Sequence, residues 1–190
     1  LRSVSTNDPD IGMEVQFYLG KAYEESGNRK EAIDIFERLL QKVPADSEEA
    51  KTNRLLFQQR LAANYWEMGE REKTIAVYRD MAKADPKANS LLLQAYRISR
   101  QFDKALPLGK QQYEKDHSNL QTGIEYAQTL TDAGKPKEGT EILNKLLQSN
   151  PDEIDLYIAL SQIYVQDKRF SDAEKILTRA EERKPKEASD

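Results

Sequence analysis

The residues that could do chemistry are few and lie far apart. His117 is the single histidine of the 190 residues and cysteine is absent, so the sequence offers no thiolate nucleophile and no Cys or His cluster for a metal. Carboxylate pairs such as Glu24–Glu25 and Glu181–Glu182 stand in charged, helix-forming stretches and are typical of solvated helix faces. No nucleotide-binding, zinc-protease or serine-hydrolase motif occurs. We therefore predict a protein that is not an enzyme, with no catalytic, metal or cofactor site.

The charge balance narrows the class of partner. The chain has 29 basic and 33 acidic residues, which gives a formal net charge of -4 and no general positive field. A nucleic-acid backbone is therefore not an expected partner. No apolar run approaches the roughly 20 residues that cross a bilayer, so we predict no membrane insertion. A soluble protein of the cytoplasm or of the periplasm fits this composition, because either can lack cysteine.

A regular period indicates the elements that must position the remaining residues. Five segments can be aligned, each beginning with a large apolar residue and four ending in Tyr one helical turn later: LGKAY (19–23), LAANY (61–65), LLQAY (92–96), YAQTL (126–130) and LSQIY (160–164). A small residue follows at a constant offset, at Ala32, Thr74, Ala105, Gly139 and Ala173. Pro44, Pro86, Pro151 and Pro185 follow four of these, and Gly27, Gly69 and Gly134 fall between the two sets. The unit is a helix, a tight turn, a second helix and a Pro-marked connection.

This unit resembles the tetratricopeptide repeat (TPR), whose signature is W-x2-L-G-x2-Y, A-x3-F and P within about 34 residues. The first copy carries Leu19, Gly20, Tyr23, Ala32, Phe36 and Pro44. The resemblance implies an all-α fold, an α-solenoid of helix-turn-helix repeats that forms a right-handed superhelix of about ten helices. The Trp of the signature is absent from every copy.

The resemblance covers residues 13–185 and divides the chain. Five repeats are expected at 13–44, 46–86, 86–118, 120–151 and 154–185, between a lead-in at 1–12 and a tail at 186–190. Pro9 stands where the Pro of a preceding repeat would fall, which suggests that the lead-in is the end of an upstream repeat. At the other end, Glu174 and Glu181 replace apolar counterparts such as Ile33 and Leu40, which is typical of the last unit of an array.

Three local departures carry predictions. The insert ADSEEAKTNR (45–54) is expected to extend a helix that begins near Ser47, with Asp46 and Glu49 as a capping box. The third repeat has Gly109 at an aromatic position and His117 for Pro, so we expect looser packing and a bend there. Gly20 costs a helix interior about 0.5–1 kcal/mol relative to Ala, and we expect it to let two helix backbones approach closely.

The resemblance also implies where a partner binds. In this family the first helices of successive repeats line a concave groove, and the second helices form the outer side. Carrying the inner positions over gives a predicted partner-binding groove of Phe17, Tyr18, Lys21, Gln59, Arg60, Trp66, Leu91, Gln94, Arg97, Ile98, Ile124, Gln128, Ile158 and Gln162. Aromatic and Arg groups are the usual anchors of such surfaces, here Tyr18, Arg60, Trp66 and Arg97. The alternative is that several of these side chains pack between adjacent first helices.

One known ligand class does not fit these positions. Family members that hold the acidic tail of heat-shock chaperones use a clamp of Lys and Asn on neighbouring first helices. The matching positions here are Phe17 with Lys21, Gln59 with Ala63, and Ser90 with Gln94. The clamp is missing, so a chaperone tail is not an expected partner.

The function predicted from the sequence is that of a non-catalytic protein-protein interaction scaffold. Its concave TPR groove would bind a peptide or helix with apolar side chains. Two alternatives stay open: a structural module that joins copies of the chain into a homo-oligomer, and an accessory TPR domain of a larger enzyme or of a secretion or assembly complex.

Overall fold

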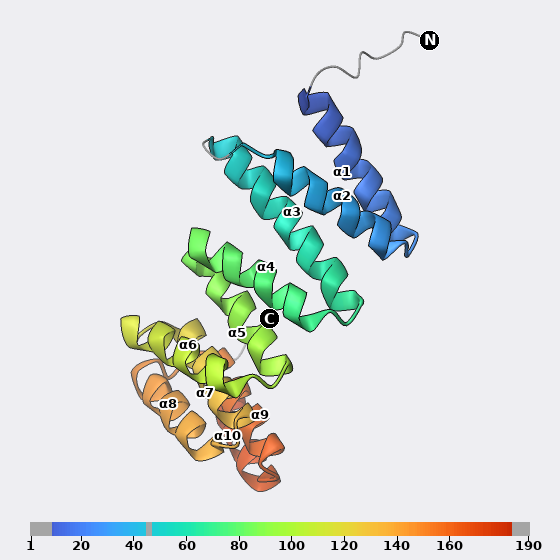
Figure 1. Cartoon of the computed structure of the whole chain (residues 1–190). Helices are drawn as coiled ribbons and strands as arrows, with labels where there is room; N and C mark the ends of the chain where they lie inside the picture. Colours follow the sequence, from blue (N-terminus) through green and yellow to red (C-terminus); the bar gives the residue numbers. More distant parts are fainter. Residues whose placement is uncertain (1–8, 45–46, 184–190) are drawn as a thin grey trace, which may run out of the picture. The chain divides into compact units, whose positions relative to one another are not determined.

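The computed structural model describes residues 9–44 and 47–183 of the chain. Within them the fold is all-α and contains no strand (Figure 1). The elements are α1 (Pro9–Glu25), α2 (Arg29–Lys42), α3 (Glu48–Glu67), α4 (Arg71–Ala84), a 3-10 helix (Pro86–Ala88), α5 (Asn89–Ile98), α6 (Phe102–Lys115), α7 (Leu120–Asp132), α8 (Pro136–Ser149), α9 (Ile154–Gln166) and α10 (Phe170–Arg183). The predicted series of about ten helices is confirmed.

Each short turn between paired helices contains one residue in the left-handed conformation. Three of these are the predicted glycines, Gly27, Gly69 and Gly134, with φ of 81°, 76° and 81°. No glycine marks the other two turns, where Arg100 and Lys168 hold φ of 55° and 59°. In every turn the N–H that follows the left-handed residue donates to a carbonyl near the end of the first helix, at 2.8–2.9 Å. The repeat geometry therefore imposes the turn even where the residue type disfavours it.

The chain forms two compact units that divide within α5. The first unit runs to Ala95 and the second begins at Tyr96. In the first unit, Phe36 and Leu39 of α2 pack with Phe57 of α3 in a shared buried cluster. Each such side chain contributes about 1.5–3 kcal/mol when it leaves water. The core of this unit therefore lies between helices of neighbouring pairs as well as within a pair.

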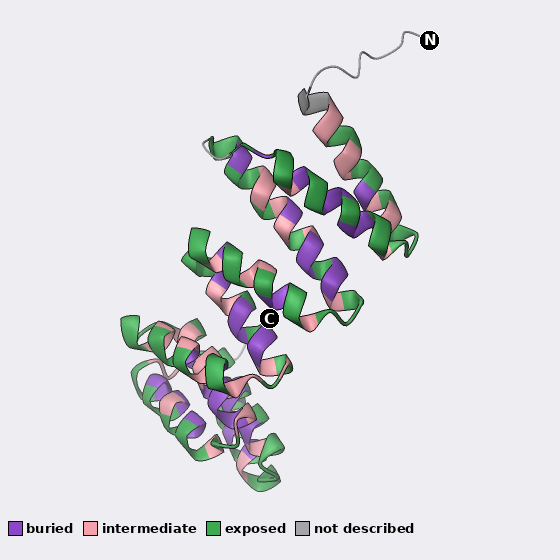
Figure 2. Ribbon diagram, viewed as in Figure 1, coloured by how far each residue is buried: buried purple, intermediate pink, exposed green. Residues whose placement is uncertain are grey.

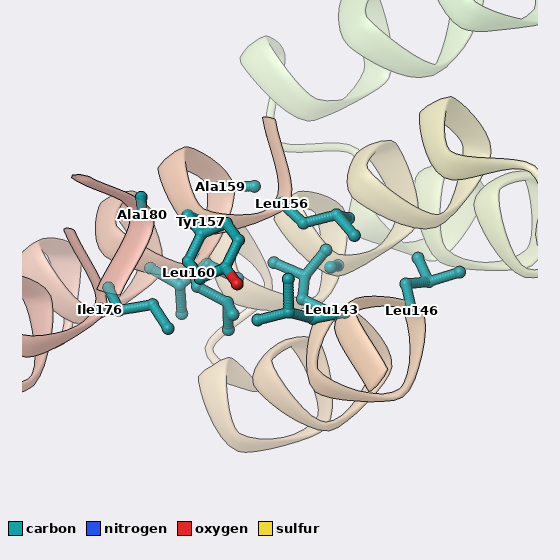
Figure 3. Close-up of a cluster of buried hydrophobic side chains, with 11 residues drawn as sticks. Leu143, Leu146, Leu156, Tyr157, Ala159, Leu160, Ile176 and Ala180 are labelled. Carbon is teal, nitrogen blue, oxygen red and sulfur yellow. The ribbon is translucent and has the colours of Figure 1, made fainter. Parts of the chain in front are cut away.

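The second unit has its own buried cluster between α8, α9 and α10 (Figure 3). Leu143 and Leu146 from α8 meet Leu156 and Leu160 of α9, and Ile176 joins them from α10. Figure 2 shows the same arrangement as buried segments along the helix faces that meet one another. The α9 helix is thus covered from both sides.

The small residues of the period mark close contacts of two kinds. A Cβ atom on Gly139 of α8 would lie 2.6 Å from the Ala127 carbonyl oxygen of α7, so two backbones do approach there. At Gly20 the prediction of a close approach is confirmed but its partner was wrong. A Cβ on Gly20 would lie 2.8 Å from Cζ of Phe36, a side chain of α2 rather than its backbone.

The inserted segment extends α3 at its N-terminus, as predicted. The helix begins at Glu48, and the Ser47 side chain accepts a hydrogen bond from the Ala50 N–H at 3.0 Å. Asp46, predicted as the capping residue, lies outside the described residues, and Ser47 is the observed cap. Among the helices that the structure describes, none has the length and apolar character needed to span a membrane.

Candidate functional site

In the first unit, α1 and α3 form a notch on the predicted inner side. The notch encloses a cavity of about 390 Å³ lined by Met13, Glu14, Phe17, Tyr18, Glu49, Asn53, Leu56 and Phe57. Tyr18 is exposed at its edge, while the Phe17 ring packs on Phe36 and Phe57 with centroids 6.2 and 5.8 Å apart. Phe17 is therefore part of the wall rather than a free anchor. The cavity combines an apolar wall with two carboxylates, Glu14 and Glu49.

The predicted groove omitted Glu49 and Asn53 because both lie in the insert, outside the repeat pattern. Glu49, Asn53 and Leu56 follow one another at helical spacing, so an extended α3 had to carry the inner face farther than the repeat does. Extending the pattern of Leu56 backwards by one and two turns was the signal available in the sequence.

A polar cluster ties α1 to α3 at the other end of the two helices. Arg60 lies 3.3 Å from the Glu24 carboxylate, and buried Asn64 donates to the same carboxylate. Arg29, at the start of α2, reaches the Asn64 side chain at 3.5 Å. Lys21 places its ammonium 5.6 Å from the centre of the Tyr18 ring. Arg60, which was predicted as an anchor for a partner, is thus paired with Glu24 of the same chain.

Trp66, near the end of α3, is half-buried. The Arg71 guanidinium lies 3.6 Å from the ring centre, and Arg71 also donates to the Trp66 carbonyl at 2.6 Å. This stacking fixes the ring next to the turn between α3 and α4.

Three other residues of the predicted groove have exposed side chains: Gln59 of α3, and Leu91 and Gln94 of α5.

In the second unit the inner positions of α5, α7 and α9 carry a second polar network. Arg97 binds Asp132 at 2.9 and 2.8 Å through two guanidinium nitrogens and Gln128 at 3.0 Å through the third. Gln166 of α9 donates to the same Asp132 at 3.3 Å. Arg97, the other predicted Arg anchor, therefore joins first helices of neighbouring pairs.

Exposed apolar side chains lie on the same helices of the second unit. Ile98 and Ile158 are exposed, as is Val165, which follows Ile158 by two turns on α9. Ile124 is half-buried and packs on the α8–α9 cluster, whereas Gln162 is exposed. These first helices thus combine fixed polar groups with uncovered aliphatic ones.

Comparisons with known proteins identify the family and the fold of the chain. Two family models, each described as a tetratricopeptide repeat, match residues 14–46 and 130–190. The chain belongs to the TPR family. No curated protein sequence matches it.

Solved TPR structures share the fold across most of the chain. A TPR protein from Parabacteroides merdae is 17% identical, with a TM-score of 0.69 over 95% of this chain and 68% of that one. The TPR-like repeats of a putative kinesin light chain from Podosopora anserina are 16% identical, with a TM-score of 0.65 over 94% and 97%. A MamA structure, designated MSR-1, is 18% identical, with a TM-score of 0.53 over 91% and 97%. At these identities the likeness concerns the fold.

Tyr65 and Asp116 are among the titratable groups of this TPR protein that have shifted pKa values, and both lie away from the notch. Burial, followed by a hydrogen bond to Glu37, raises the pKa of the Tyr65 hydroxyl well above its usual range. Hydrogen bonds from the Ser118 side chain and backbone lower the pKa of Asp116. Neither group lines the cavity, and TPR proteins in general are non-catalytic scaffolds. Within residues 9–44 and 47–183, no group of three or more acidic or His side chains converges on a metal position.

His117 lies on the side of the second helices. Its ring makes an edge contact with Tyr113, 4.8 Å between centroids, beside a cavity of about 570 Å³ between the C-terminal ends of α6 and α8. The side chain is exposed and fills the end of a helix connection, where the other repeats have Pro.

Proposed function

We propose that this TPR protein binds a segment of a partner protein along the inner faces of its first helices. The observation that carries the proposal is the notch between α1 and α3, where Tyr18 and Leu56 border a cavity large enough for one or two side chains. The TPR fold supports a protein-interaction scaffold in general, and the notch is a concave part of the first unit lined by apolar and acidic side chains.

The lining of the notch defines the chemistry of the ligand. Phe17 and Leu56 form an apolar floor, which favours an aliphatic or aromatic side chain of the partner. Glu14 and Glu49 stand at the same cavity, and none of the described residues that line it is basic. A segment with an apolar anchor next to Lys or Arg fits this lining, whereas the acidic tail of a chaperone would meet two carboxylates.

The polar network around Arg97 supports the same proposal for the second unit in a different way. Because Arg97 already binds both Asp132 and Gln128, its guanidinium is held in place and its charge is paired within the chain. Ile98 and Ile158 then offer uncovered aliphatic contacts. A partner gains little from the paired arginine itself, so the aliphatic groups are the proposed contacts.

A displayed library of random peptides tests this function even though the partner is unidentified. We expect selection on the chain to enrich peptides with an apolar residue adjacent to Lys or Arg. Tyr18→Ala and the double change Glu14→Gln with Glu49→Gln should each weaken the selected peptides about tenfold or more. Leu177→Ala, at an exposed position of α10, is the matched control and should leave the affinity unchanged.

Thermal unfolding of each variant separates binding from folding. Tyr18 and the two carboxylates are not part of the buried clusters, so their variants should melt close to the parent chain. Enriched peptides that lack a basic residue, or that bind the Tyr18→Ala variant as tightly as the parent, would contradict the proposed notch.

A further inference from the structure

A second pocket lies in the second unit, between the C-terminal ends of α6 and α8, and we call it the α6–α8 pocket. Its cavity of about 570 Å³ is lined by residues that include Tyr113, His117, Ser118, Lys145, Leu146 and Ser149. Leu146 is buried and Tyr113 is half-buried, whereas Lys145 and Ser149 are exposed. The pocket therefore has an apolar floor and a polar rim.

The pocket lies where a large side chain of the TPR signature is missing. Gly123 of α7 stands three residues before Tyr126, at the Trp position of the signature. The corresponding residue of α9, 34 residues later, is Tyr157. Tyr157 is fully buried among side chains of α8, α9 and α10 (Figure 3), and its hydroxyl donates to the Pro151 carbonyl at 2.7 Å. The α7 helix thus lacks the aromatic ring that α9 supplies at the same position.

The surroundings of Tyr157 correspond residue by residue to the lining of the α6–α8 pocket. The pairs, each 34 residues apart, are Leu147 and Tyr113, Pro151 and His117, Asp152 and Ser118, Arg179 and Lys145, Ala180 and Leu146, and Arg183 and Ser149. The Arg179 guanidinium lies 6.0 Å from the centre of the Tyr157 ring. Arg183 and Asp152 form an ion pair at 3.1 Å, which joins the end of α10 to the connection before α9. At the α6–α8 pocket, two serines replace this ion pair and no ring is present.

The space next to the α7 backbone is filled by Leu146, so a ring has to enter from outside. A Cβ on Gly123 would lie 2.3 Å from Cδ1 of Leu146, whose counterpart at the Tyr157 site is the smaller Ala180. The cavity lies farther out, beside Tyr113 and His117, whose rings make an edge contact with centroids 4.8 Å apart. An incoming aromatic ring would extend this cluster.

We propose that the α6–α8 pocket binds the side chain of a tyrosine presented by a partner protein. The ring packs on Leu146 and Tyr113, and its hydroxyl donates to the His117 carbonyl, the counterpart of the Pro151 carbonyl. The cavity volume is within the range of about 300–1,000 Å³ that is common for ligand sites. The α6–α8 pocket lies in the second unit and the notch in the first, so the two proposals can fail independently.

The rim favours an aromatic ring over an aliphatic side chain. The Lys145 ammonium takes the place of the Arg179 guanidinium over the bound ring, an attraction that an aliphatic group lacks. None of the described residues that line the pocket is acidic. The nearby Asp116 carboxylate is held by the Ser118 hydroxyl and N–H, at 2.6 and 2.9 Å. Lys145 is therefore available for the ligand.

Two small phenols are the probes. The first is p-cresol, which is the side chain of tyrosine alone, and the second is N-acetyl-L-tyrosinamide, which adds a peptide bond on each side. Backbone amide shifts of the whole isotope-labelled chain report where each probe binds, and their dependence on concentration gives the affinity. The control ligand is 4-methylcyclohexanol, which carries the same two substituents on a ring that is not aromatic.

We expect saturable shifts at Gly123, Leu146 and His117 for both phenols. The dissociation constant of p-cresol should be about 1–10 mM, as is usual for a ligand of this size. The control alcohol should bind at least about threefold more weakly, because it lacks the aromatic contacts.

Two variants test the pocket itself. The double change Gly123→Tyr with Leu146→Ala rebuilds the arrangement of Tyr157 and Ala180, so its own ring should fill the pocket and abolish p-cresol binding. Lys145→Ala, at an exposed position, should weaken p-cresol about two- to fivefold. Lys137→Ala, at another exposed lysine of α8, is the matched control and should leave the affinity unchanged. Thermal melts verify folding, and Lys145→Ala decides the test if the double variant is unfolded.

Four results would overturn the inference. The first is an absence of saturable shifts, and the second is binding that neither a folded double variant nor Lys145→Ala weakens. The third is binding of p-cresol without binding of N-acetyl-L-tyrosinamide, which would assign the pocket to a free phenol rather than to a side chain. The fourth is a concentration-dependent dimer in sedimentation that the double variant abolishes, which would assign it to a second copy of the chain. Shifts confined to the notch, at Tyr18 and Leu56, would also contradict this inference and would leave the proposed function intact.

Discussion

Two descriptions of α1 predict opposite effects of the Gly20→Ala substitution on the stability of the chain. If α1 behaved as an isolated helix, the change would stabilise the chain by about 0.5–1 kcal/mol through helix propensity. In the structure the new Cβ would stand 2.8 Å from Cζ and 3.0 Å from Cε1 of Phe36, and 3.2 Å from Cγ2 of Ile35. Phe36 is fully buried and in contact with Phe17, so its ring has little room to move.

The size of the effect follows from these two contributions. Overpacking a filled core costs about 1–3 kcal/mol, and the helix gain offsets part of it. We expect Gly20→Ala to lower the free energy of unfolding by about 0.5–2 kcal/mol. Gly12 lies in the same helix with nothing within 4 Å of its Cβ position, so Gly12→Ala is the matched control and should raise the free energy of unfolding. Gly139→Ala, which meets the Ala127 carbonyl at 2.6 Å, should be more damaging than Gly20→Ala.

Urea unfolding followed by far-ultraviolet circular dichroism measures all three variants. Midpoints and slopes are compared with those of the parent chain, since a changed slope would signal loss of a single transition. A stabilising Gly20→Ala of the same size as Gly12→Ala would show that α1 is not packed closely on α2, and would refute a packing role for the glycine.

Three further predictions address the turns, the pH dependence and the polar network. Arg100→Gly and Lys168→Gly should each stabilise the chain by about 1 kcal/mol in the same urea assay, because both residues hold a left-handed conformation that favours Gly. The pKa of Tyr65 is raised by burial and by Glu37, so its contribution to stability is full below the unfolded pKa of about 10.0 and is lost as pH rises above that value. The decline in melting temperature between about pH 9 and about pH 11 should therefore be smaller in Tyr65→Phe. Arg97→Ala should destabilise the second unit by about 1–3 kcal/mol, since it leaves Asp132 without its guanidinium partner, and an unchanged melt would show the pair to be inert.

The sequence was sufficient for the fold because the same pattern recurs in each repeat. Large apolar residues one turn apart, a small residue facing them and Gly at the turn define a helix pair even where one signal is missing. The turns at Arg100 and Lys168 contain no glycine, so the local sequence does not predict them. The cost of a left-handed non-Gly residue at these positions is outweighed by the packing of the helices on either side. The lengthening of α3 by the insert could be predicted because helix-forming residues continue through it.

The candidate site could be predicted less completely from the sequence than the fold. Inner positions follow from the repeat, but whether a side chain there is free depends on its neighbour in another repeat. Arg97 is bound because Asp132 and Gln128 stand on α7, and Arg60 is bound because Glu24 stands on α1. No local pattern reports such pairs. The notch itself depends on Glu49 and Asn53, which belong to no repeat position.

The measurement closest to the central claim is a map of where a selected peptide touches the chain. Backbone amide shifts of the labelled protein, recorded as the peptide is added, report the contact residue by residue. We predict that the largest changes fall on the notch, at Tyr18, Glu49 and Leu56 and their neighbours on α1 and α3. Changes confined to the second helices, on α2 and α4, would contradict a binding surface formed by the first helices.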